Sequence, residues 1–223
     1  MDESRTCLVT GATGYVGGRL APRLLARGHR VRALARTPEK LADALWLSDP
    51  TAEVIRGDLS DRDSLVKAFA GVDVVYHLVH SMSTDADFAA EERRAAENVV
   101  AAAQQNDVSR IVYLGGLHPS GTDLSEHLAS RAEVGDILID SPIETVALQA
   151  GTLIGSGSAS FELIRHLTER LPAMTTPRWV HNKIQPIAID DVIAYLAGVI
   201  GTEKAYGQVY EIGGADRLTY IEM

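Results

Sequence analysis

Three glycines near the N-terminus have a spacing that can hold a phosphate group. Gly11, Gly14 and Gly17 form the pattern Gly-x-x-Gly-x-x-Gly, directly after the apolar run 7–10 and at the start of an amphipathic segment. Glycine permits a tight turn and a close approach of the backbone to a ligand, and a helix N-terminus offers free N–H groups to an anion. We assign Gly11 to the turn, Gly14 to the approach of a pyrophosphate and Gly17 to close helix packing. A strand, such a turn and a helix, in this order, predict a dinucleotide site; glycines in a surface loop are the alternative.

The end of the second predicted strand, residues 31–35, indicates which dinucleotide binds. Sites for NAD place a carboxylate there to hold the ribose hydroxyls of the adenosine. In this chain Ala35 stands at that place and Arg36 follows it. No carboxylate repels a 2′-phosphate there and a guanidinium can pair with it, so NADP(H) is favoured over NAD(H). An ordinary surface role for Arg36 is the alternative.

Asp58 follows the third predicted strand, residues 53–57, and is placed to accept a hydrogen bond from the adenine amine. It also precedes the predicted helix at residues 60–70, where the helix dipole favours an acid. The spacing leaves both roles open.

The elements that position these residues alternate between apolar strands and longer amphipathic helices, and Gly28 ends the first helix. The predicted strands cover residues 7–10, 31–35, 53–57, 72–78, 111–114, 143–148, 184–189 and 208–212. The predicted helices cover residues 15–27, 38–47, 60–70, 85–105, 124–139, 161–170 and 190–200. This alternation predicts βαβ units, and all-apolar strands predict a sheet buried on both faces. We expect an α/β Rossmann fold, a doubly wound parallel sheet with helices on both faces and a small irregular C-terminal lobe on the substrate side.

The chain, residues 1–223, is expected to form a single NAD(P)-binding domain. Residues 1–150 give the dinucleotide core and residues 151–223 an elaborated part on the substrate side. Near the end, Thr219 and Glu222 have the spacing of a capping box, which begins a helix. We therefore expect a further C-terminal segment to follow; a frayed natural terminus is the alternative.

Composition excludes several classes of protein. The 30 acidic and 21 basic residues give a net charge of −9, which repels nucleic acid. The longest apolar stretch, residues 192–200, is far shorter than the roughly 20 residues of a membrane span. The N-terminus is acidic and polar, unlike a secretory signal. We expect a cytoplasmic protein with a small-molecule substrate, no membrane partner, and a homodimer as one open possibility.

Several stretches together carry a family resemblance: the turn at residues 10–18, the motif Gly-Asp-Leu-Ser-Asp at 57–61, and residues 74–82, 110–114 and 185–192. On them the chain resembles the atypical, extended-type short-chain dehydrogenase/reductases of the NAD(P)-binding epimerase/dehydratase-like superfamily. The resemblance spans essentially the whole chain and implies an NAD(P)H-dependent oxidoreductase whose cofactor crosses the sheet beside the fourth strand. The candidate cofactor-binding residues are Gly11, Thr13, Gly14, Tyr15, Val16, Gly17, Arg36, Asp58, Leu59, Leu78, Val79 and His80.

The resemblance fails at the catalytic residues. The family uses a Tyr-x-x-x-Lys pair, which moves a proton to or from the carbonyl oxygen, and a Ser or Thr at the end of the fifth strand. Here His127 and Arg131 stand in place of the pair and Gly116 in place of the serine. His127 can serve as a substitute acid, and Arg131 can hold the cofactor ribose without passing protons. Both are otherwise ordinary polar residues, and the catalytic residues stay unknown.

His77 and His80 do not suggest a metal site, because residues three apart on a strand point their rings to opposite faces. His80 is placed to touch the nicotinamide ribose, with a plain loop histidine as the alternative. Two functions remain: an NADP(H)-dependent reductase of a quinone-like or other electrophilic acceptor, or a non-catalytic protein that senses the state of NADP(H).

Overall fold

The computed structural model describes residues 4–80, 87–118, 124–158, 161–162, 165–166 and 178–223. Seven parallel strands form its main sheet, in the order β10-β6-β5-β4-β1-β2-β3. They are β1 (Thr6–Thr10), β2 (Arg30–Ala35), β3 (Ala52–Arg56), β4 (Val74–His77), β5 (Arg110–Gly116), β6 (Glu144–Ala150) and β10 (Gln208–Ile212). The order reverses between β1 and β4, which is where doubly wound sheets bind dinucleotides. The predicted Rossmann-like fold is confirmed.

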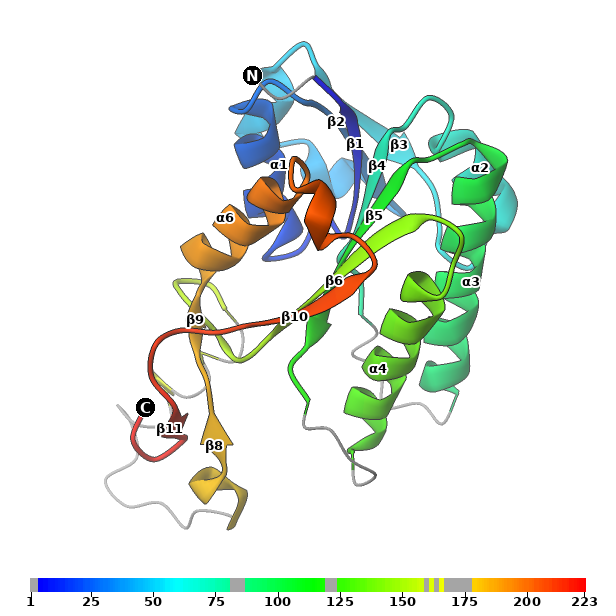
Figure 1. Ribbon diagram of the computed structural model, residues 1–223. Coiled ribbons are helices and arrows are strands. Elements are labelled where there is room, and N and C mark those ends of the chain that lie inside the picture. The colour runs from blue at the N-terminus through cyan, green and yellow to red at the C-terminus, as the bar shows by residue number, and fades with distance from the viewer. Residues whose placement is uncertain (1–3, 81–86, 119–123, 159–160, 163–164, 167–177) are drawn as a thin grey trace.

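Helices cover both faces of this sheet (Figure 1). On one face α1 (Gly17–Leu25) packs against α6 (Ile189–Val199). On the other lie α2 (Arg62–Ala68), α3 (Phe88–Gln105) and α4 (Glu126–Ile139), with α3 between its two neighbours. Each face has its own apolar core, one containing Leu20 and Leu196 and the other Leu65 and Val99. The inner strands β1, β4 and β5 are almost entirely buried because both of their faces are covered, whereas the outer strands β3 and β10 are mostly exposed or half-buried.

Most predicted helices form, with shorter ends. The first helix begins at Gly17 rather than Tyr15, because the glycine turn uses the two residues before it. Gly28 has a φ of +86°, as its predicted role as a helix stop requires. The start of the helix predicted at 85–105 and most of the one at 161–170 lie outside the described residues.

The single helix predicted at residues 38–47 is wrong. Two short 3₁₀ helices stand there instead, Pro38–Leu41 and Leu45–Ser48, separated at Ala44, whose backbone is extended. A continuous helix would place Leu41 and Leu45 on the same face. The structure buries Leu41 and leaves 90% of Leu45 exposed, so the break aims the two turns differently.

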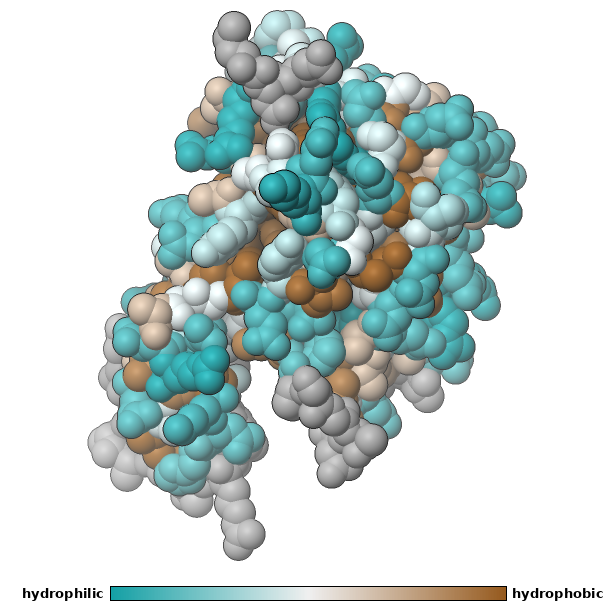
Figure 2. Space-filling model, in the orientation of Figure 1, coloured by the Kyte–Doolittle hydropathy of each residue, from teal (hydrophilic) through white to brown (hydrophobic). Residues whose placement is uncertain are grey.

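The C-terminal third adds a small lobe beside the sheet. It contains the parallel pair β7 (Leu153–Ile154) and β9 (Ile187–Ala188) and the antiparallel pair β8 (Lys183–Ile184) and β11 (Leu218–Thr219). The residues predicted as one strand, 184–189, are divided between β8, β9 and the first residue of α6, because Pro186 interrupts the ladder. The lobe projects past the carboxyl ends of the main strands, and a notch separates it from the body of the molecule (Figures 1 and 2).

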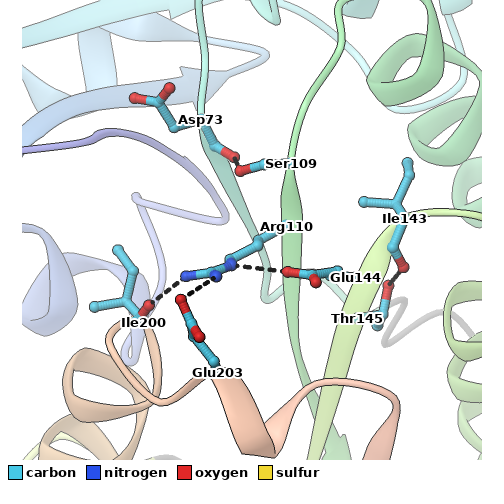
Figure 3. A network of polar contacts seen from close by, with 8 residues as sticks. All are labelled: Asp73, Ser109, Arg110, Ile143, Glu144, Thr145, Ile200 and Glu203. Atoms are coloured by element: carbon cyan, nitrogen blue, oxygen red, sulfur yellow. Dashed lines mark hydrogen bonds and ion pairs between the residues drawn. The ribbon is translucent and has the colours of Figure 1, made fainter.

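At the amino ends of the strands, one buried arginine contacts the C-terminal third of the chain (Figure 3). Arg110, at the start of β5, is 8% exposed. Its guanidinium donates to Glu144 (3.1 Å) and to the carbonyl of Ile200 (3.0 Å), and it lies 3.8 Å from Glu203. It also packs 4.6 Å from the ring centre of Tyr206. One side chain therefore connects β5, β6 and the turn after α6.

Candidate cofactor and active site

The glycine turn is built by contacts that only glycine permits. Gly11 has a φ of +68°, and the Gly14 N–H donates to the Gly11 carbonyl at 2.8 Å. A Cβ atom on Gly14 would lie 3.1 Å from that oxygen, and one on Gly17 would lie 2.3 Å from it. Gly17 thus allows the first turn of α1 to close onto the backbone of the glycine turn. The turn therefore presents exposed backbone at Thr13 and Gly14 in front of the α1 N-terminus, and the free N–H groups of a helix N-terminus suit an anion such as a pyrophosphate.

Thr10 joins the turn to the switch point of the sheet. Its buried hydroxyl donates to the Tyr76 carbonyl (3.1 Å) and accepts from the Leu78 N–H (3.0 Å). On the next residue, a Cβ atom on Gly11 would lie 3.2 Å from the Val79 side chain. The structure therefore brings the predicted residues Leu78 and Val79 beside the glycine turn. The sequence analysis did not single out Thr10, although its place at a strand end was a signal.

Arg36 lies at the end of β2 with its side chain exposed, as an arginine that meets a 2′-phosphate would. A second arginine is beside it: Arg56, at the end of β3, donates to the Arg36 carbonyl at 3.1 Å and pairs with Glu39 at 2.8 Å. Sequence reasoning missed Arg56, because the neighbourhood arises from the register that pairs Ala35 with Arg56.

Asp58 and Leu59 have local partners. One carboxylate oxygen of Asp58 accepts from the N–H and the hydroxyl of Ser60, both at 2.9 Å. The Asp58 N–H donates to Ser64, and the Leu59 carbonyl accepts from Asn98 at 2.8 Å. The helix N-terminus itself is capped by Asp61, not Asp58; Asp58 caps the preceding turn through one oxygen, and its role toward adenine stays a prediction.

Two histidines meet the same tyrosine at the carboxyl end of β4. The Tyr113 ring centre lies 5.9 Å from that of His77 and 5.7 Å from that of His80. The prediction that the two imidazoles point to opposite faces is therefore wrong, because β4 ends at His77 and the alternation of a strand does not continue to His80. The Leu114 carbonyl lies 2.7 Å from His80 Nε2, and a carbonyl only accepts, so this nitrogen carries a proton.

The three groups are electrically neutral near pH 7. Burial, with a smaller effect from His80, lowers the pKa of His77 to about 3. Burial and then the positive charge of Arg131 lower the pKa of His80. Burial and then the negative charge of Glu92 raise the pKa of Tyr113, whose phenol donates to the Arg131 carbonyl at 2.9 Å. This tyrosine is thus held as a structural donor.

Of the two residues at the family's Tyr and Lys positions, His127 and Arg131, only Arg131 lies beside Gly116. A Cβ atom on Gly116 would lie 3.4 Å from Arg131 Nη1 and 3.5 Å from Leu128, so these two side chains face the position of the family's serine. His127 is exposed and its ring lies 4.5 Å from that of Phe88 on α3. The structure brings Arg131 to the strand end and turns His127 toward the neighbouring helix.

A buried acid lies behind Arg131. Glu92 on α3 is 8% exposed and accepts a hydrogen bond from the hydroxyl of Ser130, which is also buried. Its charge acts on both His80 and Tyr113. Glu92 lies in the helix predicted at residues 85–105, in a run of charged residues that is typical of a solvated face; it is buried instead, because α4 packs over this part of α3.

The glycine turn also contacts the C-terminal lobe. The Arg19 guanidinium donates to the carbonyls of Tyr15 (3.1 Å) and Ser156 (2.9 Å). The buried Tyr15 hydroxyl has no hydrogen-bond partner among the described residues, and a Cβ atom on Gly155 would lie 2.6 Å from it. Residues 155–158 are therefore docked on the first turn of α1, a contact between segments too distant in sequence to predict.

The sheet, its switch point and the glycine turn define a dinucleotide-binding protein. The family described as NAD(P)H-binding matches residues 11–166. The chain belongs to that family, within the epimerase/dehydratase-like, atypical short-chain dehydrogenase/reductase superfamily.

Relatives and solved structures agree with this placement. A 3 beta-hydroxysteroid dehydrogenase/Delta 5-->4-isomerase of Mycobacterium tuberculosis is 27% identical over 96% of this chain and 66% of its own length. A (4-alkanoyl-5-oxo-2,5-dihydrofuran-3-yl)methyl phosphate reductase of Streptomyces griseus is 29% identical over 96% of this chain and 70% of its own. A nucleoside-diphosphate-sugar epimerase of Staphylococcus aureus shares the fold, with a TM-score of 0.80, 20% identity, and coverage of 97% of this chain and 74% of that one.

The chain is shorter than these proteins; it spans 66% of the mycobacterial dehydrogenase and 45% of a ketoreductase of Stigmatella aurantiaca. Among the helices that the structure describes, none is long and apolar enough to cross a membrane. In the same residues, no three His, Cys, Asp or Glu side chains come together as a metal site.

Proposed function

We propose that this protein is an NADP(H)-dependent reductase of a small electrophilic acceptor, of the quinone-like kind, that needs no tyrosine acid. The observation that carries the proposal is the pairing at the end of β5, where Arg131 faces Gly116. A guanidinium stays charged at every relevant pH, so it can stabilise an anion but cannot deliver a proton. The one tyrosine in this cluster, Tyr113, is held by the Arg131 carbonyl.

In this proposal the bound cofactor supplies a hydride, and the chain supplies its binding site. The backbone of Gly11, Thr13, Gly14 and the first turn of α1 would hold the pyrophosphate. Leu78, Val79 and His80 would line the nicotinamide half, and Asp58 with Leu59 the adenine.

Preference for NADP(H) is part of the proposal. Ala35 stands where an NAD site has a carboxylate, the exposed Arg36 follows it, and Arg56 lies next to Arg36. Glu39 already neutralises Arg56, so Arg36 is the arginine available to a 2′-phosphate.

The names of two relatives support a reductase. The Streptomyces griseus protein is named as a reductase and the Stigmatella aurantiaca protein, 38% identical over 64% of this chain, as a ketoreductase. The second candidate, a non-catalytic protein that senses NADP(H), is favoured by one observation: the His127 ring lies against Phe88 on α3, while Arg131 and Leu128 face Gly116 at the strand end.

Steady-state oxidation of NADPH with a panel of quinones and dyes tests the choice. Turnover of any acceptor, with NADPH preferred to NADH, supports the reductase. Tight binding of NADPH without turnover of any acceptor would overturn it in favour of the sensor.

A further inference from the structure

We propose that Arg131 and Gly116 form an oxyanion site, which limits the acceptors to conjugated carbonyl compounds: enones and quinones. The inference deepens the proposed function and rests on it, because it says which acceptors the same site can reduce. Its first support is position. Gly116 ends β5, on the far side of the β1–β4 switch point from the adenosine-binding strands β2 and β3, and a dinucleotide that crosses the switch point puts its nicotinamide on this side.

The second support is space. A Cβ atom on Gly116 would lie 3.4 Å from Arg131 Nη1 and 3.6 Å from Arg131 Cδ. These distances place the guanidinium directly beside the end of β5. Because glycine has no side chain, nothing from residue 116 stands between the strand end and the Nη1 donors, so an acceptor oxygen that approaches the strand end can reach them.

The third support is an arginine with spare donors. In the part of the chain that the structure describes, the Arg131 guanidinium makes no hydrogen bond and no ion pair. Two other arginines that are buried or half-buried behave differently: Arg32 pairs with Glu53 and Arg110 with Glu144. All five N–H donors of Arg131 are thus available to a ligand.

The fourth support is the charge around it. His77, His80 and Tyr113 are neutral near pH 7, so they do not compete for an anion. Glu92 is the nearby negative charge, and its carboxylate accepts a hydrogen bond from the hydroxyl of Ser130, the residue before Arg131. The positive charge of Arg131 is therefore directed at the strand end, where it also depresses the pKa of His80.

This arrangement selects the acceptor by the basicity of its product. The acceptor gains a hydride from the cofactor, which loses two electrons, and the displaced π-electron pair comes to rest on the acceptor oxygen. With a conjugated acceptor the product is an enolate or phenolate, whose conjugate acid has a pKa of about 10 in the phenol case. Arg131 can hold this anion until it leaves and takes a proton from water. An isolated ketone would give an alkoxide, which is far more basic and needs an acid in the site.

Two cyclic ketones that differ only in conjugation test the substrate class. We expect turnover of 2-cyclohexenone and of 1,4-naphthoquinone with NADPH, and none of cyclohexanone. The substitution Arg131→Gln should lower kcat/KM for the conjugated acceptors by about 100-fold, as loss of an oxyanion donor does, and leave the Kd of NADPH within threefold. Arg131→Lys should recover part of the loss, and Arg94→Gln, an exposed arginine on α3, should change nothing.

A second readout needs no turnover. The absorbance of 4-nitrophenol reports its ionisation, and an oxyanion site should lower the pKa of the probe when it binds the NADP⁺-loaded protein. Arg131→Gln should abolish that shift. If no acceptor is reduced, the reductase proposal fails while a pKa shift that depends on Arg131 still supports the oxyanion site. An unshifted pKa of 4-nitrophenol, or reduction of cyclohexanone, would overturn the oxyanion site. A rise in the NADPH Kd of Arg131→Gln that equals its loss of rate would also overturn it and would assign Arg131 to a ribose contact.

Discussion

The guanidinium of Arg19 lies over the ring of Tyr15, with 4.0 Å between Cζ and the ring centre. The same guanidinium donates to the Ser156 carbonyl, so a residue of the first helix holds the start of the C-terminal lobe. The Tyr15 backbone belongs to the glycine turn and its side chain faces Gly155. The turn that is expected to bind phosphate and the loop that leads into the lobe therefore share one contact.

Arg19→Ala should loosen that loop. Loss of a charge-assisted hydrogen bond and a cation–π contact costs about 1–2 kcal/mol at an exposed site, which corresponds to amide exchange faster by roughly 5- to 30-fold. Hydrogen–deuterium exchange of residues 155–158 measures it. Arg23→Ala, which removes an exposed arginine from the same helix, is the matched control, and equal exchange in both variants would show that Arg19 does not hold the loop.

Gly17→Ala should disrupt the glycine turn. The added Cβ would lie 2.3 Å from the Gly11 carbonyl oxygen, a backbone atom that cannot move aside without opening the turn. We expect a loss of about 1–3 kcal/mol in unfolding free energy and NADPH affinity reduced at least tenfold. Gly18→Ala, whose Cβ would lie 3.4 Å from the Ala12 oxygen, should bind NADPH normally. Titration of cofactor fluorescence compares them, and normal binding by both variants would disprove the role of Gly17.

Arg36→Ala should change the preference between cofactors. A guanidinium–phosphate contact contributes about 1.5–3 kcal/mol, so the NADPH Kd should rise by roughly 10- to 100-fold while the NADH Kd stays constant. Arg62→Ala, an exposed arginine at the start of α2, controls for the loss of one charge. An NADPH/NADH affinity ratio that does not change in Arg36→Ala ends the argument for NADP(H) specificity.

His77 should make the fold sensitive to acid. Its pKa falls to about 3 on burial from an ordinary value of 6.5, so below pH 6.5 the unfolded chain binds a proton that the folded chain does not. Stability is then complete above pH 6.5 and declines toward pH 3, with a slope of up to roughly 1.4 kcal/mol per pH unit. Urea titrations from pH 7 to pH 4 should show a weaker dependence in His77→Phe. The exposed His127→Gln should match the parent, and an unchanged slope in His77→Phe would refute the assignment.

Local chemistry allowed much of the fold and of the cofactor turn to be predicted. The alternation of apolar runs and amphipathic segments is set by neighbours in the chain, and it was enough to predict most of the strands and helices and the parallel βαβ arrangement. Gly11 and Gly28 could be recognised because their positive φ angles suit glycine alone. The prediction of one helix at residues 38–47 was wrong because the burial of Leu41, and not of Leu45, depends on packing against the rest of the protein, which local propensity does not report.

The arrangement of side chains around Gly116, at the end of β5, could not be predicted in the same way. Which side chain faces Gly116 depends on how α4 rotates against β5, and the sequence placed His127 and Arg131 on equal terms. The burial of Glu92 depends on the packing of α3 against α4. The contact of Arg19 with Ser156 joins residues 137 positions apart, and no local pattern indicates such a pair.

The network around Arg110 determines where this chain can be shortened. Its guanidinium uses the Ile200 carbonyl and lies near Glu203 and the Tyr206 ring, all of which follow α6. A version that ends at Val199 would keep the pair with Glu144 but remove these partners, and the loss of a hydrogen bond to a charged group costs about 1.5–3 kcal/mol. A minimal dinucleotide-binding fragment should therefore retain residues through Ile212, the end of β10, and is expected to melt in one transition.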